Sequence, residues 1–317
     1  MIDRRALLAA LAAGACSPRP AEPSAGAAGP VLAAGQPAAL LIWALAPERL
    51  IGWPRQPSAS GLALLPPAAA SLPETGALAG GGAPMSLEAA AALRPDFILD
   101  YGDRDAADLD LAERIHRRIG RPYYLIDGDL MRMPDALREA GQLLGVKARG
   151  EQFADMAERL ITEWQRPRQS GPAFYYARGA DGLETAFRGA LATEVLEGGA
   201  WRNVAVGGRD IGRVSREQVV AWDPEAVVTL DRRFAESAAD DPVWRRRPDG
   251  SRRRLTLLPD QPFGWIDRPP SVNRLLGVHW AAFGDRAPAG IAALMGDLYG
   301  RVPTATELAD LTPRDIP

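Results

Sequence analysis

An α/β fold with two similar lobes is predicted from three features of this 317-residue sequence. Short apolar runs of strand length alternate with segments of helical periodicity, which is typical of the α/β class. One sequence pattern occurs twice, 129 residues apart: SLEAAAALRPDFIL from Ser86 and SREQVVAWDPEAVV from Ser215. The chain length suggests about two domains. We expect the two lobes to face each other across a bound ligand.

Each copy of the repeated pattern predicts a capped helix, a turn at a proline followed by an acidic residue, and a buried strand. Ser86 and Ser215 are candidate N-caps, because a serine oxygen accepts an amide proton that has no partner within the helix. Glu88 and Glu217 follow two residues later, where a negative charge offsets the helix dipole by ~0.3–1 kcal/mol. This local effect by itself explains both glutamates.

The first lobe has strand patterns in PDFILDYG and PYYLIDGD, each followed by a polar loop. The segment between them, ADLDLAERIHRRIG, has helical spacing and ends at Gly120. A long helical pattern follows at residues 134–164, and Gly145 and Gly150 are expected to break it. The second part of this pattern is the predicted connection between the lobes.

The second lobe repeats this alternation. Strands are predicted in AFYYARG, AVVTLD and RLTLLPD, and a short helix in ATEVLEGGAWRNVA ends at a Gly-Gly pair. RPPSVNRLLGVHWAAFG predicts a helix with a proline-rich start. The predicted organisation is an export signal at 1–15, a flexible tether at 16–30, an N-terminal lobe at 31–147, a bridging helix at 148–170 and a C-terminal lobe at 171–317.

The first residues, MIDRRALLAALAAGAC, have the basic start and short apolar run of an export signal. The run is too short to span a bilayer. Cys16, the only cysteine, ends a lipobox-like AGAC and is the predicted lipidation site. The Arg4-Arg5 pair leaves Sec and twin-arginine export both open. We expect a periplasmic protein held at the membrane only by its lipid anchor.

Charge and composition exclude several kinds of partner. The net charge of -3 argues against a general nucleic-acid binder. Only His116 and His279 are histidines, and no CxxC is present, so direct metal coordination is not expected. Neither a nucleophile elbow nor a His-based triad is evident, which argues against an enzyme. An exported hydrolase remains only as an alternative from another class, beside an exported ligand sensor.

Six segments, in their order and spacing, carry a resemblance to a known family: SLEAAAALRPDFIL, LLG from Leu143, YYARGADGLET from Tyr175, LEGGAWRNVA from Leu196, VSREQVVAWDPE from Val214 and PFGWIDRPPSVNRLLG from Pro262. The chain resembles the helical-backbone (class III) periplasmic substrate-binding proteins of ABC transporters, of the iron-siderophore and cobalamin family. The resemblance covers nearly everything after the tether. It implies two Rossmann-like lobes joined by one long α-helix, with the ligand in the cleft between them.

The resemblance also implies partners and roles. Glu88 and Glu217 would pair, one per lobe, with arginines of an ABC permease dimer that works with its ATPase. The protein would be a monomer without a cofactor of its own. It would carry a small-molecule metal chelate, with a ferric siderophore as the leading expectation and cobalamin, haem or an oxyanion such as molybdate as alternatives.

The ligand-binding candidates lie in loops that follow predicted strands, because open α/β sheets bind ligands at the carboxyl ends of their strands. Aromatic faces supply apolar contact area, and arginine forks bind carboxylate or catecholate oxygens. The candidates are Trp53, Arg55, Tyr101, Arg178, Glu184, Arg188, Trp265, Asp267 and Arg268.

Overall fold

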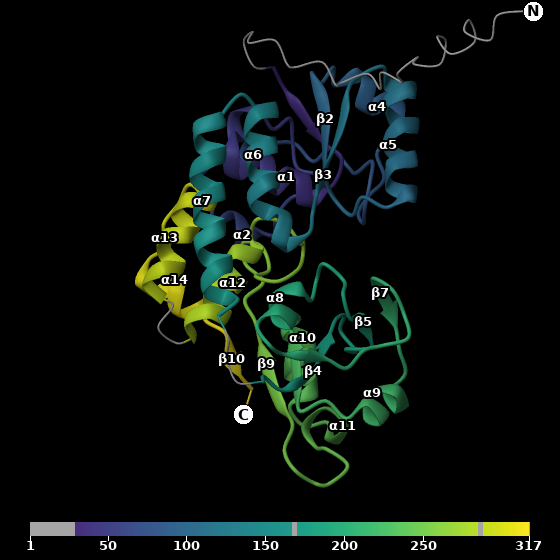
Figure 1. The fold of residues 1–317 in the computed structure, drawn as a ribbon, viewed down its shortest axis with the longest axis vertical. Coiled ribbons are helices and arrows are strands. Elements are labelled where there is room, and N and C mark those ends of the chain that lie inside the picture. Colours follow the sequence, from purple (N-terminus) through teal and green to yellow (C-terminus); the bar gives the residue numbers. More distant parts are fainter. Residues whose placement is uncertain (1–28, 167–169, 285–287, 317) are drawn as a thin grey trace, which may run out of the picture.

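The computed structural model describes residues 29–166, 170–284 and 288–316 and has two α/β lobes, one above the other in Figure 1. The predicted α/β class is therefore confirmed. The predicted export signal, Cys16 and nearly all of the tether lie outside the described residues.

The N-terminal lobe is built on a parallel sheet in the order β1-β2-β3. Its strands are β1 (Val31–Ala33), β2 (Phe97–Gly102) and β3 (Tyr123–Asp127). Alternate residues of β1 and β2 enter two hydrophobic clusters, one on each face of the sheet. The helices of this lobe are α1 (Gln36–Leu45), η1 (Pro47–Arg49), α2 (Ala59–Leu62), α3 (Ala68–Ser71), α4 (Leu87–Ala92), α5 (Ala106–Ile119), η2 (Leu130–Arg132) and α6 (Met133–Leu143).

The C-terminal lobe has a five-stranded sheet in the order β10-β9-β8-β4-β6, in which only β10 is antiparallel to its neighbour. The strands are β4 (Ala173–Ala177), β6 (Arg202–Asn203), β8 (Ala226–Thr229), β9 (Arg254–Leu257) and β10 (Arg314–Asp315). A separate antiparallel pair joins β5 (Glu184–Ala186) to β7 (Ile211–Arg213). The helices are α8 (Glu194–Gly198), α9 (Arg216–Trp222), α10 (Arg232–Ala238), α11 (Pro242–Arg245), α12 (Arg274–Phe283), α13 (Pro288–Tyr299) and α14 (Ala305–Asp310).

The connection between the lobes is α7 (Lys147–Trp164), which packs along α6 (Figure 1). The expected break at Gly145 is confirmed, since this residue has φ +73° between the two helices. The expected break at Gly150 is wrong, because Gly150 lies inside α7. A Cβ atom on Gly150 would lie 2.9 Å from the Cα atom of Gly141 in α6, so the glycines serve close helix packing instead.

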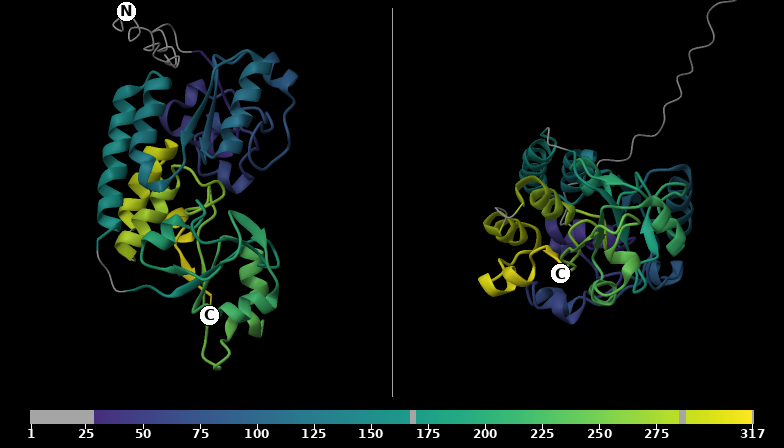
Figure 2. Two further views of the ribbon diagram at one scale, coloured as in Figure 1. Left: turned by 45° about the vertical axis from the view of Figure 1, so that its right-hand side comes forward. Right: turned by 90° about the horizontal axis from the view of Figure 1, so that it is seen from below.

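The last helices of the chain reach beyond the C-terminal lobe. Helix α12 packs against α7, and α13 packs against α1 of the N-terminal lobe (Figures 1 and 2). The tail then returns to the C-terminal lobe, where β10 pairs with β9. The chain therefore links its lobes by these packed helices as well as by α7.

The two copies of the repeated pattern fold in the same way. Ser86 Oγ accepts the amide of Ala89 at 3.1 Å, and Ser215 Oγ accepts the amide of Gln218 at 3.2 Å, so both predicted N-caps are confirmed. Each helix is followed by a left-handed residue and then by proline, and a strand comes next. The left-handed residues are Arg94 with φ +49° and Asp223 with φ +44°.

Candidate functional site

The carboxyl ends of the parallel strands in one lobe point toward those in the other lobe. We call the loops that follow these strand ends the interlobe region. Several contacts join the lobes there. Ser58 Oγ donates to Gln261 Oε1 at 2.9 Å, and Ser271 Oγ donates to the carbonyl of Pro37 at 2.7 Å. Open α/β sheets bind their ligands at the carboxyl ends of the strands, which is where these loops lie.

On the N-terminal side, the interlobe region begins at the ends of β2 and β3. Asp100 accepts a hydrogen bond from Tyr123 at 2.6 Å, and burial raises the pKa of Asp100. Asp103 follows in the exposed loop. Its pKa is raised by desolvation first and then by the charge of Asp210 in the C-terminal lobe, and Asp105 adds to the effect. Carboxylates of the two lobes thus repel each other across this region.

On the C-terminal side, Asp267 is the centre of a buried polar cluster. Its carboxylate pairs with Arg178 and accepts a hydrogen bond from Tyr176 at 3.0 Å. Arg178 also pairs with Glu184 at 2.9 Å, and the amide of Arg268 donates to Asp267 at 2.7 Å. The structure therefore brings together four of the sequence candidates: Arg178, Glu184, Asp267 and Arg268. Their polar groups bind one another in this structure.

Trp53 does not fit the expected ligand contact. Its side chain is fully buried, its Nε1 donates to the carbonyl of Ala69 at 3.0 Å, and its ring packs against Trp43 and Phe263. This tryptophan supports the core beneath the interlobe region. Sequence reasoning missed this because a Trp beside Gly and Pro has the same local pattern in a core as in a binding loop.

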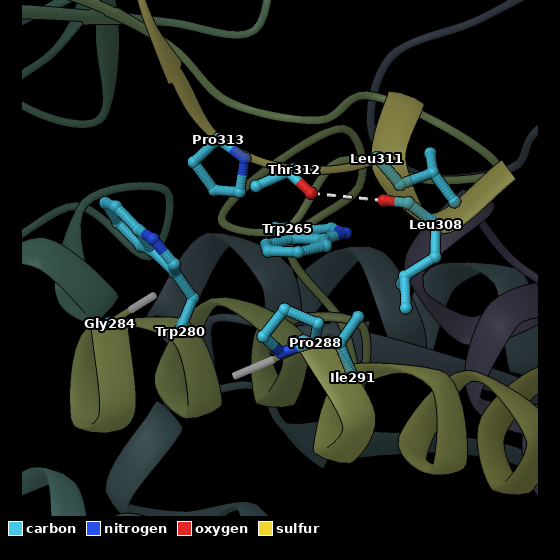
Figure 3. A pocket seen from close by; sticks show the side chains of 9 residues that line it. All are labelled: Trp265, Trp280, Gly284, Pro288, Ile291, Leu308, Leu311, Thr312 and Pro313. Carbon is cyan, nitrogen blue, oxygen red and sulfur yellow. Dashed lines mark hydrogen bonds between the residues drawn. The ribbon is translucent and has the colours of Figure 1, made fainter. Parts of the chain in front are cut away.

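Trp265 is also buried, and it faces a different part of the molecule. Its ring helps to line a cavity of about 240 Å³ between α12, α13 and α14. Figure 3 shows the ring among Pro288, Ile291 and Thr312. Its Nε1 has no hydrogen-bond partner among the described residues. This position corrects the expectation that Trp265 lies on the interlobe surface.

The remaining candidates lie apart from one another. Arg55 is exposed in the loop after Trp53, and Arg188 is exposed and binds the carbonyl of Asn203 through Nε and Nη2. Tyr101 is buried at the end of β2, and its hydroxyl accepts from Arg274 at 3.1 Å. This hydrogen bond therefore joins β2 to the start of α12, 173 residues further along the chain.

Arg274 of α12 and Glu194 of α8 are two residues beside the interlobe region that sequence reasoning missed. Arg274 has no exposed surface and pairs with Glu194 at 2.5 Å. A fully buried arginine in the apolar segment NRLLGVHW was the available signal, because such a charge needs buried partners. Desolvation raises the pKa of Glu194 to about 7, against the attraction of Arg274.

Besides the cavity at Trp265, a crevice lies next to Glu194. It holds about 440 Å³ and is lined from both lobes, by η2 and by α8, and by the end of α7 at Trp164. Glu194 is one of its lining residues. The crevice therefore borders the Glu194 carboxylate on the side of Trp164.

Glu88 and Glu217 lie on α4 and α9, which precede the strands β2 and β8 and are outside the interlobe region. Both side chains are exposed, in the first turns of α4 and α9. The two helices lie on one side of the molecule, opposite α7, and each belongs to a different lobe (Figure 1). The repeated pattern thus places one exposed carboxylate on each lobe along a single side.

Within the described ranges, no three His, Cys, Asp or Glu side chains are arranged to hold a metal ion. No helix of the described part of the chain is long and apolar enough to cross a membrane. The side chains described above for the interlobe region are arginines, carboxylates and buried aromatic rings.

The fold is that of the two-lobed periplasmic binding proteins. The chain is similar to an ABC transporter solute-binding protein from Sulfurospirillum deleyianum, with 24% identity, a TM-score of 0.77, and coverage of 89% of this chain and 93% of that one. A periplasmic solute-binding protein from Veillonella parvula matches with 16% identity, a TM-score of 0.67, and coverage of 90% and 91%.

The molybdate periplasmic binding protein of Haemophilus influenzae matches with 15% identity and a TM-score of 0.66, over 88% of this chain and 95% of that one. Periplasmic haem-binding and vitamin B12-binding proteins of Vibrio cholerae also share the fold. No protein-family model matches the chain, and no curated protein sequence matches it. At these identities the likeness establishes the fold.

Proposed function

We propose that this chain is the solute-binding component of an ABC importer, without enzymatic activity, and that its solute binds in the interlobe region. One observation carries the proposal: two parallel-stranded lobes direct their strand ends toward each other while packed helices hold them together. The same arrangement occurs in proteins named as solute-binding proteins of ABC transporters and as periplasmic binding proteins. Export and lipidation at Cys16 are part of the proposal.

The proposed solute is a metal chelate of the ferric-siderophore type. The named neighbours bind haem, vitamin B12 and molybdate, each of which contains a metal. Arg104 and Arg209 are exposed beside the interlobe carboxylates, one on each lobe. Guanidinium groups suit the oxygen atoms of a chelate, and the metal arrives already coordinated. Haem, a corrinoid and molybdate are the alternatives of the same class.

Binding is tested by tryptophan fluorescence during titration with a ferric hydroxamate, haemin, cyanocobalamin, molybdate and free iron. We expect quenching by the ferric chelate and much less by free iron. Native mass spectrometry of the protein purified from its own periplasm then gives the mass of the solute. If none of these compounds changes the fluorescence and no bound mass is found, the proposal is wrong.

The site within the protein is tested with Arg104→Gln and Arg209→Gln. Loss of a charged hydrogen bond costs about 1.5–3 kcal/mol, so affinity for the chelate should fall roughly tenfold or more. Arg121→Gln is the matched control, because Arg121 is exposed just before β3, at the opposite end of the sheet. Equal effects of the three variants would contradict a solute in the interlobe region.

A further inference from the structure

A buried arginine joins the two lobes beside the strand ends. The guanidinium of Arg274, at the start of α12, is fully buried. It pairs with Glu194 of α8 in the C-terminal lobe at 2.5 Å. Toward the N-terminal lobe it donates to the hydroxyl of Tyr101 at 3.1 Å and to the carbonyl of Gly128. One side chain thus binds the end of β2, the loop after β3 and a helix of the other lobe.

Glu194 adds a second link of the same kind. Its Oε2 atom accepts the amide of Leu130 at 3.1 Å, and Leu130 begins η2 in the N-terminal lobe. We call Arg274, Glu194, Tyr101, Gly128 and Leu130 the interlobe latch. These four contacts join residues more than 60 positions apart in the chain.

The helices that carry the latch are fixed to the bridging helix. Helix α12 packs against both α7 and α8. Trp164, the last residue of α7, donates from Nε1 to the carbonyl of Val195 in α8 at 3.0 Å. A Cβ atom on Gly198 would lie 1.9 Å from the ring of Trp164, so α8 fits closely against this ring. Helices α7, α8 and α12 therefore form one packed group. The hydrogen bonds of the latch connect this group to the ends of β2 and β3 in the N-terminal lobe.

We propose that Arg274 and Glu194 are positioning residues that set the spacing of the two lobes and thereby the affinity of the interlobe region for its solute. The statement on affinity rests on the proposed function, whereas the statement on lobe spacing does not. Arg274 acts through Tyr101 and Gly128, which continue into the loops expected to meet the solute. Its full burial leaves it no surface for contact with the solute itself.

The charge of the latch changes near neutral pH. Desolvation raises the pKa of Glu194 to about 7; Arg274 from α12 opposes this, and Asp129 from the loop after β3 adds to it. Glu197, one turn further along α8, lines the same water-accessible crevice. Above pH 7 the pair of Arg274 and Glu194 is ionic. Separation of the lobes would hydrate Glu194 and return its pKa toward the ordinary glutamate value, so the protonated form favours the closed latch and ionisation above pH 7 favours its opening.

The effect on folding stability has the same direction. The folded pKa of about 7 lies above the ordinary glutamate value of 4.5. Between these values the folded protein binds a proton that the unfolded chain does not. The contribution of Glu194 to stability is therefore largest below pH 4.5 and is lost as the pH rises to 7.

Lobe spacing is tested on the full chain by electron-spin distance measurements at pH 5 and pH 8. Cys16→Ser removes the only cysteine, and Arg118→Cys in α5 and Arg233→Cys in α10 place one label on an exposed helix of each lobe. We expect one narrow distance distribution at pH 5 and a broader one at pH 8. Glu194→Gln should abolish the difference between the two pH values, because the amide does not titrate in this range.

Arg274→Met removes all contacts of the guanidinium and should broaden the distribution at both pH values. Arg274→Lys keeps the positive charge but lacks the planar guanidinium group that binds Glu194, Tyr101 and Gly128 at once. It therefore tests the hydrogen-bond geometry even if the methionine variant fails to fold. Unchanged distributions in the lysine variant would overturn the proposal. A pH response in Glu194→Gln equal to that of the parent chain would overturn it as well.

Solute affinity is measured on the same variants at both pH values. We expect several-fold weaker binding in Arg274→Lys and loss of the pH dependence in Glu194→Gln. If the distances respond and no solute binds, the latch stands and the proposed function fails. If solute binds and neither distance nor affinity responds to the variants, the latch fails and the proposed function stands.

Discussion

At the scale of single residues, several buried charges in the described part of the chain are held by partners from distant parts of the sequence. Asp267 shows this most clearly, since its side chain is almost fully buried. It accepts hydrogen bonds from Tyr176 and from the amide of Arg268 and pairs with Arg178. Removing one member of such a cluster leaves the others buried without a partner, which is more costly than the net value of the pair.

We predict that Asp267→Ala lowers the free energy of unfolding by about 3–5 kcal/mol, because Arg178 then keeps a buried charge without its main partner. Asp267→Asn should cost less, since the amide oxygen still accepts a hydrogen bond from Tyr176. Urea unfolding followed by circular dichroism measures both. Glu217→Gln, at an exposed position, is the control and should stay close to the parent chain. An Asp267→Ala variant as stable as this control would contradict the assignment.

At the scale of helices, α6 and α7 approach closely because glycines face each other. Gly141 of α6 and Gly150 of α7 leave no room for a side chain at the contact. Arg149 then ties α7 to α1, since its Nε donates to the carbonyl of Ala44 at 2.9 Å. The bridging helix is thus fixed along its length to the N-terminal lobe and by Trp164 to α8.

Gly150→Ala tests this packing. Alanine normally stabilises a helix interior by about 1 kcal/mol relative to glycine. At this position we expect a loss of about 1–3 kcal/mol instead, because the new Cβ would meet the backbone of Leu137 and Gly141 at 2.8–2.9 Å. Thermal unfolding provides the measurement.

The matched control is Gly296→Ala in α13. Its Cβ would meet only the tip of Val302, a largely exposed side chain that is free to rotate away. This variant should be neutral or slightly stabilised. Similar changes in the two variants would contradict a specific role for the contact between Gly141 and Gly150.

At the scale of the whole molecule, the repeated pattern defines a surface rather than a binding site. Helices α4 and α9 lie on the side opposite α7, one on each lobe, and each exposes a glutamate in its first turn (Figure 1). We propose that Glu88 and Glu217 contact arginines of the permease from this side. Exposed ion pairs are individually weak and screened by salt, so both lobes would be needed for docking.

Reversing both charges, Glu88→Arg with Glu217→Arg, should abolish solute uptake in vesicles that contain the permease and its ATPase. Solute affinity measured by calorimetry should stay unchanged, because neither residue lies in the interlobe region. Glu236→Arg, at an exposed position of α10, is the control. A fall in affinity in the double variant would instead assign the glutamates to the binding site or to the fold.

Local patterns were sufficient to predict most of the elements. The strands at PDFILDYG, PYYLIDGD and AFYYARG and the two serine caps are present as expected, because periodicity and capping depend on neighbours within a few residues. The expectation for Gly150 was wrong because its partner, Gly141, belongs to another helix. The expectations for Trp53 and Trp265 did not fit because burial depends on what packs above a loop.

By itself, the sequence determined the α/β class, the repeated capped unit and the two exposed glutamates. Each of these follows from contacts within one or two helical turns or from strand alternation. Only the tertiary structure decided that Arg274 meets Tyr101, 173 residues away, and that Glu194 completes the latch. A contact across such a distance forms when both lobes have folded and packed, because burial removes the water that otherwise solvates these charges.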